Sequence, residues 1–161
     1  MLTFRLAELR DLSAIMEVIL QAQAFMATLG IDQWQDGYPS KELIAHDIER
    51  QQAYVYDDNG VIASIVILIP GPESVYEAIE GAWQFPGNYL TLHRIAISDS
   101  HRHSGLAKSI LENTIAYAVK NGFSSIRTDT HRGNLAMRRF LEKNDFGLCG
   151  IVRYEESAGD P

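Results

Sequence analysis

Residues 89–120 constrain the fold of this chain more than any other part of the sequence. The stretch opens with a mostly apolar run, residues 89–97, which predicts a buried strand, and continues with a polar loop, residues 98–104. Over residues 105–120 the apolar side chains recur at helical spacing, and Asn121-Gly122 ends the pattern. A buried strand followed directly by a long amphipathic helix is typical of α/β domains, in which helices cover the faces of one sheet.

The remaining sequence continues this alternation of strands and helices. Apolar patterning predicts strands over residues 3–6, 53–56, 61–68, 124–128, 146–148 and 151–154. Helical spacing predicts helices over residues 11–29 and 134–143, and a further helix that begins at Ser40. Asp57-Asp58-Asn59-Gly60 is a strong hairpin turn signal, whereas residues 73–88 show no clear pattern. The chain is therefore expected to form a single domain over residues 1–161.

Charge and cysteine content exclude several classes of protein. The chain has 14 Lys and Arg against 21 Asp and Glu, a formal net charge of −7, so no nucleic-acid partner is expected. The single cysteine, Cys149, excludes a disulfide framework and a Cys-rich zinc module, and no metal is expected. The longest apolar run, residues 65–69, is far too short to span a bilayer, and the first residues lack a signal pattern. A cytoplasmic protein with no membrane partner is expected.

The net charge hides an asymmetry along the chain. Residues 93–143 contain nine Lys and Arg and four Asp and Glu, a net charge of +5, and the remainder has a net charge of −12. An uneven distribution of this kind indicates that the two parts meet different ligands.

The loop that joins the long strand to the long helix has the features of a phosphate site. Its sequence is Arg102-x-x-Gly105-x-Ala107, and such a junction directs several backbone N–H groups and the positive end of the helix dipole at one point. Gly105 allows the backbone to approach a ligand closely. The glycine spacings of the P-loop and of the dinucleotide fingerprint are absent. On these residues alone, an ordinary strand-to-helix turn remains an alternative.

This Arg-x-x-Gly-x-Ala loop resembles the Gln/Arg-x-x-Gly-x-Gly/Ala loop of the GNAT superfamily of N-acetyltransferases. Phe4-Arg5-x-Ala7, the hairpin at residues 60–64 and the late segment at residues 134–146 are similar to other parts of the family pattern, so the resemblance covers nearly all of the chain. It implies the GNAT fold, an α/β (α+β) architecture. Its central sheet is mixed, mostly antiparallel and twisted, with about six to seven strands flanked by about four helices.

The resemblance also implies that the chain binds acetyl-CoA. The residues that would bind the pyrophosphate are Arg102, His103, Ser104, Gly105, Leu106, Ala107 and Lys108. Ile95, Ala96 and Ile97 would pair with the pantetheine arm through their backbone, as an added strand does. Asn134 would bond the pantetheine or position the late helix, and it is equally explained as a helix N-cap.

The implied activity is transfer of an acetyl group to a primary amine by direct attack in a ternary complex. His93 is the candidate general base, with a buried, backbone-bonded histidine as the alternative. Leu141 stands where the family often has the tyrosine that protonates the leaving thiolate. Leucine cannot protonate the thiolate, so Tyr154 is the candidate general acid, although packing at a sheet edge is the favoured interpretation of Tyr154. If Arg94 points into the core it needs a carboxylate, and Asp129 is the candidate.

The acceptor side is described less closely by the sequence. The positions that the resemblance places around an acceptor pocket are Gln33, Trp34, Tyr38, Tyr76, Trp83 and Tyr89. Aromatic side chains suit an aromatic or cationic group, and loop packing is the alternative. The acceptor is expected to be a small-molecule or peptide amine, and the acidic part of the chain favours a cationic one. A GNAT-fold CoA-binding or regulatory protein without efficient turnover, transfer of a different acyl group, and a homodimer all stay open.

Overall fold

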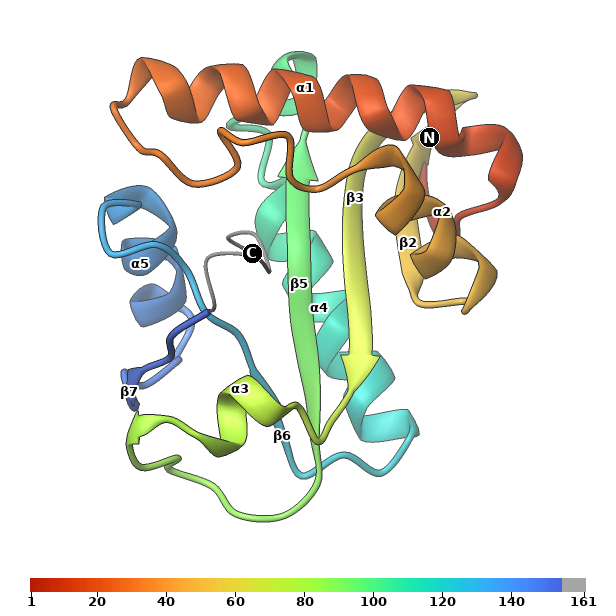
Figure 1. Cartoon of the computed structure of the whole chain (residues 1–161). Coiled ribbons are helices and arrows are strands. Elements are labelled where there is room, and N and C mark those ends of the chain that lie inside the picture. Colours follow the sequence, from red (N-terminus) through yellow and green to blue (C-terminus); the bar gives the residue numbers. More distant parts are fainter. Residues whose placement is uncertain (155–161) are drawn as a thin grey trace.

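The computed structural model describes residues 1–154 and forms one central sheet with helices on both faces (Figure 1). Its strands are β1 (Leu2–Leu6), β2 (Ala53–Asp58), β3 (Val61–Pro70), β4 (Glu80–Gly81), β5 (Tyr89–Ile97), β6 (Ser125–Arg127) and β7 (Gly150–Ile151). Its helices are α1 (Leu12–Thr28), α2 (Lys41–Glu49), α3 (Ser74–Glu77), α4 (Leu106–Lys120) and α5 (Leu135–Lys143). Two 3₁₀ turns, η1 (Leu9–Asp11) and η2 (Asp99–His101), precede α1 and α4.

The central sheet has the order β1-β2-β3-β5-β6. All neighbouring strands are antiparallel except β5 and β6, which run parallel, and α4 makes the crossover between them. The expected mixed, mostly antiparallel sheet is confirmed. Of the strands in residues 1–154, five form this sheet, and β4 and β7 form a separate small one.

Two apolar cores, one on each face, hold the helices to the sheet. Helices α1 and α2 pack on the face that includes Ile65 and Ile67, while α4 packs on the face that includes Val66 and Leu68. Strand β3 is therefore apolar on both sides, which explains its nearly continuous apolar sequence. In Figure 1, α1 crosses one end of the sheet and α5 stands beside the outer edge of β5.

The carboxy-terminal part differs from the sequence expectation. Residues 146–148 are in no strand, and of the last predicted strand, residues 151–154, only Ile151 pairs, as part of β7 with β4. Two glycines let the backbones of β4 and β7 approach closely, since a Cβ on Gly150 would lie 2.3 Å from the Glu80 carbonyl oxygen. Leu148 is 84% exposed and has no sheet to pack against.

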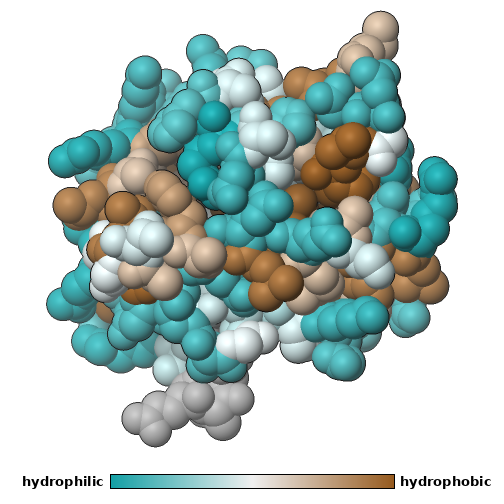
Figure 2. All heavy atoms as spheres, turned by 90° about the horizontal axis from the view of Figure 1, so that it is seen from above, coloured by the Kyte–Doolittle hydropathy of each residue, from teal (hydrophilic) through white to brown (hydrophobic). Residues whose placement is uncertain are grey.

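The surface over α1 is predominantly hydrophilic. Figure 2 views this side and shows polar residues interrupted by scattered apolar ones. The exposed apolar side chains of α1 and the turn after it are Leu20, Phe25 and Leu29. Within residues 1–154, no helix has the length and apolar character required to cross a membrane.

Candidate active site

Strand β5 separates from β6 near its middle, and this opening creates the candidate site. The parallel ladder pairs Tyr89 to Thr91 of β5 with β6 and ends there. The Thr128 hydroxyl donates to the Leu92 carbonyl at 2.8 Å, and beyond this point residues 1–154 provide no β6 partner for β5. The predicted pantetheine-pairing residues Ile95, Ala96 and Ile97 lie in this opened half of the strand.

A β-bulge at Arg94 redirects the side chains of β5. Ala96 pairs with Ile65 and His93 with Ile67, so the ladder shifts register between them, and Arg94 has a left-handed φ of 49°. Sparsely populated backbone conformations of this kind cluster at functional sites.

Arg94 binds Asp47 of α2, so the predicted pairing with Asp129 is wrong. Its guanidinium donates to both Asp47 carboxylate oxygens, at 2.9 and 3.0 Å, and to the Tyr38 hydroxyl at 3.0 Å. Burial lowers the pKa of Arg94, but Tyr38 and Asp47 outweigh burial and raise it. The bulge explains the error, because the local backbone turn directs the side chain toward α2, which simple strand alternation does not anticipate.

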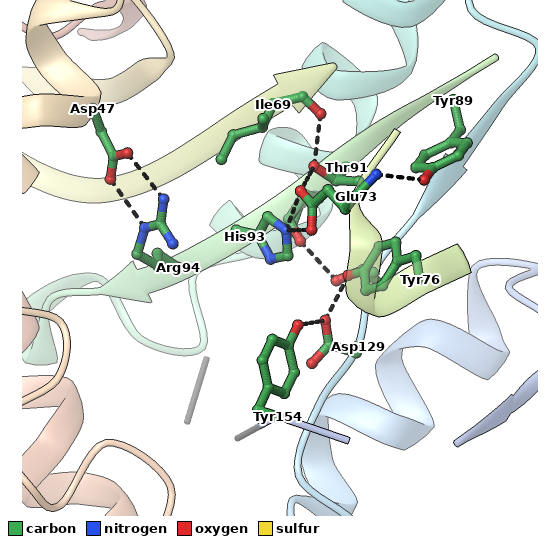
Figure 3. A network of polar contacts seen from close by, with 12 residues as sticks. Asp47, Ile69, Glu73, Tyr76, Tyr89, Thr91, His93, Arg94, Asp129 and Tyr154 are labelled. Atoms are coloured by element: carbon green, nitrogen blue, oxygen red, sulfur yellow. Dashed lines mark hydrogen bonds and ion pairs between the residues drawn. The ribbon is translucent and has the colours of Figure 1, made fainter. Parts of the chain in front are cut away.

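His93 is held by a carboxylate that sequence reasoning missed. Its Nε2 lies 2.8 and 3.0 Å from the two carboxylate oxygens of Glu73 (Figure 3). The Thr91 hydroxyl is 2.8 Å from the same carboxylate, and the Glu73 backbone N–H donates to the Tyr89 hydroxyl at 2.8 Å. With Nε2 facing the carboxylate, Nδ1 is the ring nitrogen that can accept a proton.

Burial raises the pKa of Glu73, but the His93 contact, the Thr91 hydrogen bond and the Arg94 charge together outweigh burial and lower it. Glu73 is therefore a carboxylate at neutral pH. It fixes both the orientation of the His93 ring and the tautomer that leaves Nδ1 unprotonated.

A second polar cluster surrounds Asp129, just after β6. Its Oδ1 accepts a hydrogen bond from the Tyr76 hydroxyl at 2.5 Å and one from the Tyr154 hydroxyl at 3.0 Å (Figure 3). Burial, assisted by the Asp129 charge, raises the pKa of both phenols, so both stay protonated and keep donating at neutral pH. Tyr154, the sequence candidate for a general acid, is thus a hydrogen-bond donor to a carboxylate.

The predicted pyrophosphate loop presents free backbone donors at the start of α4. Gly105 is the N-cap of α4 with φ of 83°, and no side chain caps this end. Within residues 1–154, the backbone N–H groups that donate no hydrogen bond here belong to His103, Gly105, Leu106, Ala107 and Lys108. A Cβ on Gly105 would meet nothing within 4 Å, so the space beside this turn is open. The arrangement is that of an anion site.

The side chains of this loop contribute unequally. Arg102 lies 4.1 Å above the Phe25 ring and donates to Asp99 at 2.5 Å, so part of its charge is neutralised. Leu106 is buried in the core, which leaves only its backbone available to a ligand. His103, Ser104 and Lys108 are exposed.

A cavity of about 70 Å³ lies between the opened half of β5, the start of α4 and α5. The predicted site residues that line it are Gln33, Trp34, His93, Ile95, Ala107 and Asn134. Asn134 also caps α5, because its side chain accepts the Met137 N–H at 3.2 Å. No residue of α5 is buried, although its apolar face includes Phe140 and Leu141, since that face lines the cavity instead of a packed core.

A larger groove of about 1070 Å³ adjoins the cavity, and the two share Thr128, Asp129, Thr130 and Leu141. Trp83 and Tyr154 line the groove. A molecule that enters through the groove therefore reaches the cavity beside Asp129.

The six predicted acceptor residues divide into two groups. Trp34 lines the cavity with only 4% of its surface exposed and a left-handed φ of 64°, and its Nε1 has no hydrogen-bond partner within residues 1–154. Gln33 lies beside it. The others make packing contacts: Tyr38 binds Arg94, and Tyr76 is fully buried.

Trp83 and Tyr89 enclose a guanidinium that the protein itself supplies. The Arg127 side chain lies 4.4 Å from the Trp83 ring and 3.8 Å from the Tyr89 ring. Their cation–π capacity is thus used internally, although Trp83 also lines the groove.

Glu73 and Asp129 are the site carboxylates for which no role near a substrate was predicted from the sequence. Glu73 begins the stretch without a clear pattern, and it meets His93 only because α3 folds back over β5. The one available signal was that Asp129, an acid, directly follows a predicted buried strand. Within residues 1–154, no group of three or more His, Cys, Asp or Glu side chains is arranged to hold a metal ion.

The fold and the site together define an acetyltransferase domain of the GNAT type. The model of the acetyltransferase (GNAT) family matches residues 18–146, and the chain belongs to this family. It is similar to a GNAT-family acetyltransferase from Streptococcus agalactiae, with 39% identity and a TM-score of 0.85 over 96% of this chain and 90% of the other.

More distant solved structures share the fold. A GNAT-family acetyltransferase from Listeria monocytogenes has 19% identity and a TM-score of 0.76, covering 93% of this chain and 88% of its own. The aminoglycoside acetyltransferase AAC(6')-Iy, solved with a bisubstrate analogue, has 16% identity and a TM-score of 0.67, with 97% of each chain covered. No sequence among the curated proteins matches this chain.

Proposed function

We propose that this chain is an acetyl-CoA-dependent N-acetyltransferase that acts on a primary amine by direct attack in a ternary complex. The observation that carries the proposal is a convergence on one cavity. Ile95 of the opened half of β5, Ala107 of the first turn of α4 and His93, which Glu73 holds from behind the cavity wall, all line it. A phosphate site, an extended edge for a pantetheine arm and a proton acceptor are the parts that this reaction requires.

The residues present fit acetyl-CoA. The free N–H groups from His103 to Lys108 match the pyrophosphate, and the opened β5 edge at Ile95 to Ile97 matches the pantetheine amides. Asn134, on the cavity wall, is within the same path. When bound, acetyl-CoA supplies the acetyl group as an activated thioester, which an amine converts to an amide with release of the thiol.

His93 takes the proton from the amine in this proposal. Glu73 holds Nε2, so Nδ1 accepts the proton, and the Glu73 carboxylate stabilises the resulting imidazolium. The Ile95 backbone N–H lies in the opened edge, where it can polarise a carbonyl.

No tyrosine stands at the usual place to protonate the departing thiolate, because Leu141 lines the cavity there. Tyr154 is the candidate donor of this chain: its phenol is protonated, bonded to Asp129, and borders the adjoining groove. Water is the alternative donor. Leu141 also favours a second candidate function, a CoA-binding protein without efficient turnover.

The acceptor is a small-molecule or peptide amine in this proposal. AAC(6')-Iy, named as an aminoglycoside N-acetyltransferase, and a ribosomal-protein-alanine N-acetyltransferase from Brucella melitensis share the fold. The names of these two enzymes cover a small-molecule acceptor and a protein acceptor. The acyl chain length, the cytoplasmic location and the homodimer remain predictions.

The test is thiol release from acetyl-CoA over a panel of primary amines, with calorimetry of CoA binding alongside. His93→Ala should lower kcat by about 100-fold or more and leave CoA affinity unchanged, since general-base catalysis contributes roughly 10²–10⁴. His46→Ala, which removes an exposed histidine from α2, is the matched control. CoA binding without thiol release for any amine would favour the second candidate. An unchanged rate and pH profile in His93→Ala would remove the base assignment.

A further inference from the structure

Asp129 differs from the other well-shielded acids of this protein in having no cationic partner. Asp11 pairs with Arg5 at 2.8 Å, and Asp47 pairs with Arg94 at 2.9 Å. Within residues 1–154, no Lys, Arg or His forms an ion pair with Asp129, although it lies partly buried against the cavity. A carboxylate taken partly out of water is costly unless a positive charge compensates it.

The two groups that bind Asp129 are neutral, and they occupy the same oxygen. Tyr76 and Tyr154 both donate to Oδ1, while Oδ2 accepts no hydrogen bond within residues 1–154. In Figure 3 the two phenols converge on this one carboxylate oxygen. They hold the carboxylate in place and leave its charge unneutralised and one oxygen available.

Asp129 lies where the groove meets the small cavity. It is one of the residues shared by the groove and the small cavity, and the cavity also includes His93. At about 70 Å³ the cavity has room for only a few non-hydrogen atoms, such as an unhindered aminomethyl end. The rest of an acceptor would lie in the groove.

The remainder of the groove shows little charge preference. Its other acidic lining residues are Asp36 and Glu142, and its arginines are Arg132, Arg138 and Arg153. Arg153 is already paired with Glu80, at 2.8 and 3.1 Å. The uncompensated charge closest to the reaction cavity is therefore that of Asp129.

We infer that Asp129 is the specificity-determining residue for the acceptor: its free Oδ2 binds the ammonium form of a primary amine on an unbranched carbon and presents it to His93. The inference deepens the proposed function and rests on it. The ammonium loses one proton to His93 Nδ1, and the neutral amine that results is the nucleophile. Acceptors that are neutral at the assay pH gain nothing from this contact.

Asp129→Asn tests the assignment, because asparagine keeps the shape of the side chain and an oxygen for both phenols but removes the charge. The probes are 2-phenylethylamine, a cation at pH 7.5, and 2,2,2-trifluoroethylamine, which is mainly neutral there. KM for the cationic amine should rise about 10- to 100-fold in the variant, as expected for a lost hydrogen bond between charged groups, with kcat changed by less than about threefold. KM for the neutral amine and for acetyl-CoA should stay within about threefold.

Two further variants control the experiment. Glu49→Gln removes one exposed acidic charge from α2 and should leave both amines unaffected. Asp129→Glu keeps the charge and should preserve the preference for the cationic amine. Equal losses for the two amines in Asp129→Asn would mean that Asp129 only positions its tyrosines, and no loss would mean that it contacts no substrate. Either result overturns the inference.

Calorimetric affinity of the CoA-bound protein for 2-phenylethylamine gives a readout that needs no turnover. Weaker binding to Asp129→Asn supports the inference even if the parent protein acetylates slowly. A parent protein that binds CoA and the amine but releases no thiol would contradict the proposed function alone. A parent protein that acetylates the amine with no dependence on Asp129 would contradict the inference alone.

Discussion

Replacing Asp47 by asparagine tests whether the ion pair behind the β5 bulge stabilises the fold. The Asp47 and Arg94 side chains are 3% and 10% exposed, and two hydrogen bonds of 2.9 and 3.0 Å join them. Asp47→Asn leaves the buried guanidinium without its counter-charge, and breaking a buried pair on one side costs about 3–5 kcal/mol. The Tyr38 hydroxyl stays in place, but a neutral group does not compensate the charge.

Urea unfolding followed by circular dichroism measures this cost. With an m-value of about 2 kcal/mol per M, the midpoint should fall by about 1.5–2.5 M with an unchanged slope. Arg94→Met should be similarly destabilised, because it leaves the buried Asp47 carboxylate without its counter-charge. The double variant should recover much of the loss, since a buried pair replaced on both sides costs far less than either half alone.

A loss below about 1 kcal/mol in Asp47→Asn would refute the reasoning, because it would place the pair in a solvent-like environment. Additive losses in the double variant would refute it as well. They would show that the two residues contribute independently and not as a pair.

Two more predictions concern Gly105, in the loop before α4, and the contact between Glu73 and His93. Gly105→Ala should lower the free energy of unfolding by about 1 kcal/mol, because φ of 83° strains an L-residue, and it should weaken CoA binding in calorimetry. Gly122→Ala is the control, since Gly122 has φ of 76° and equally open space. It should lower stability by as much without affecting CoA binding. Burial raises the Glu73 pKa, but the His93 contact, with help from Thr91 and Arg94, outweighs burial and lowers the pKa from the ordinary 4.5. The stabilisation from the ionised Glu73 carboxylate is thus present above its ordinary pKa and is lost on acidification. The unfolding free energy of Glu73→Gln should therefore fall less steeply between about pH 6 and 3 than that of the parent protein.

The fold was largely predictable because its signals are local. Strand β5 and helices α1, α4 and α5 have strong apolar periodicity, and their bounds lie within a few residues of the predictions. The small β4–β7 sheet was not predictable, because it depends on a close approach of two glycines, Gly81 and Gly150, from distant parts of the chain. Such a contact leaves no pattern in either segment alone.

The site was predictable only where the backbone makes it. The Gly105 turn is encoded by a short motif, and the structure places free N–H donors there. The side-chain contacts are encoded by the fold: Glu73 meets His93 and Asp47 meets Arg94 across separations of 20 and 47 residues. Strand alternation failed at Arg94 for a related reason, since the bulge that reorients it is a property of the β3–β5 pairing.

The charge partition along the chain needs a different interpretation once the contacts are known. Three of the nine basic side chains in residues 93–143 are already engaged, since Arg94 binds Asp47, Arg102 binds Asp99 and Arg127 lies between two aromatic rings. A phosphate group at the start of α4 would meet the free backbone N–H groups and the exposed Lys108 there. The converse holds for Asp129, an acid inside the basic segment: because no cation of residues 1–154 forms an ion pair with it, its charge is directed at whatever enters the cavity. Local compensation, and not the sum over a segment, decides which charges a ligand meets.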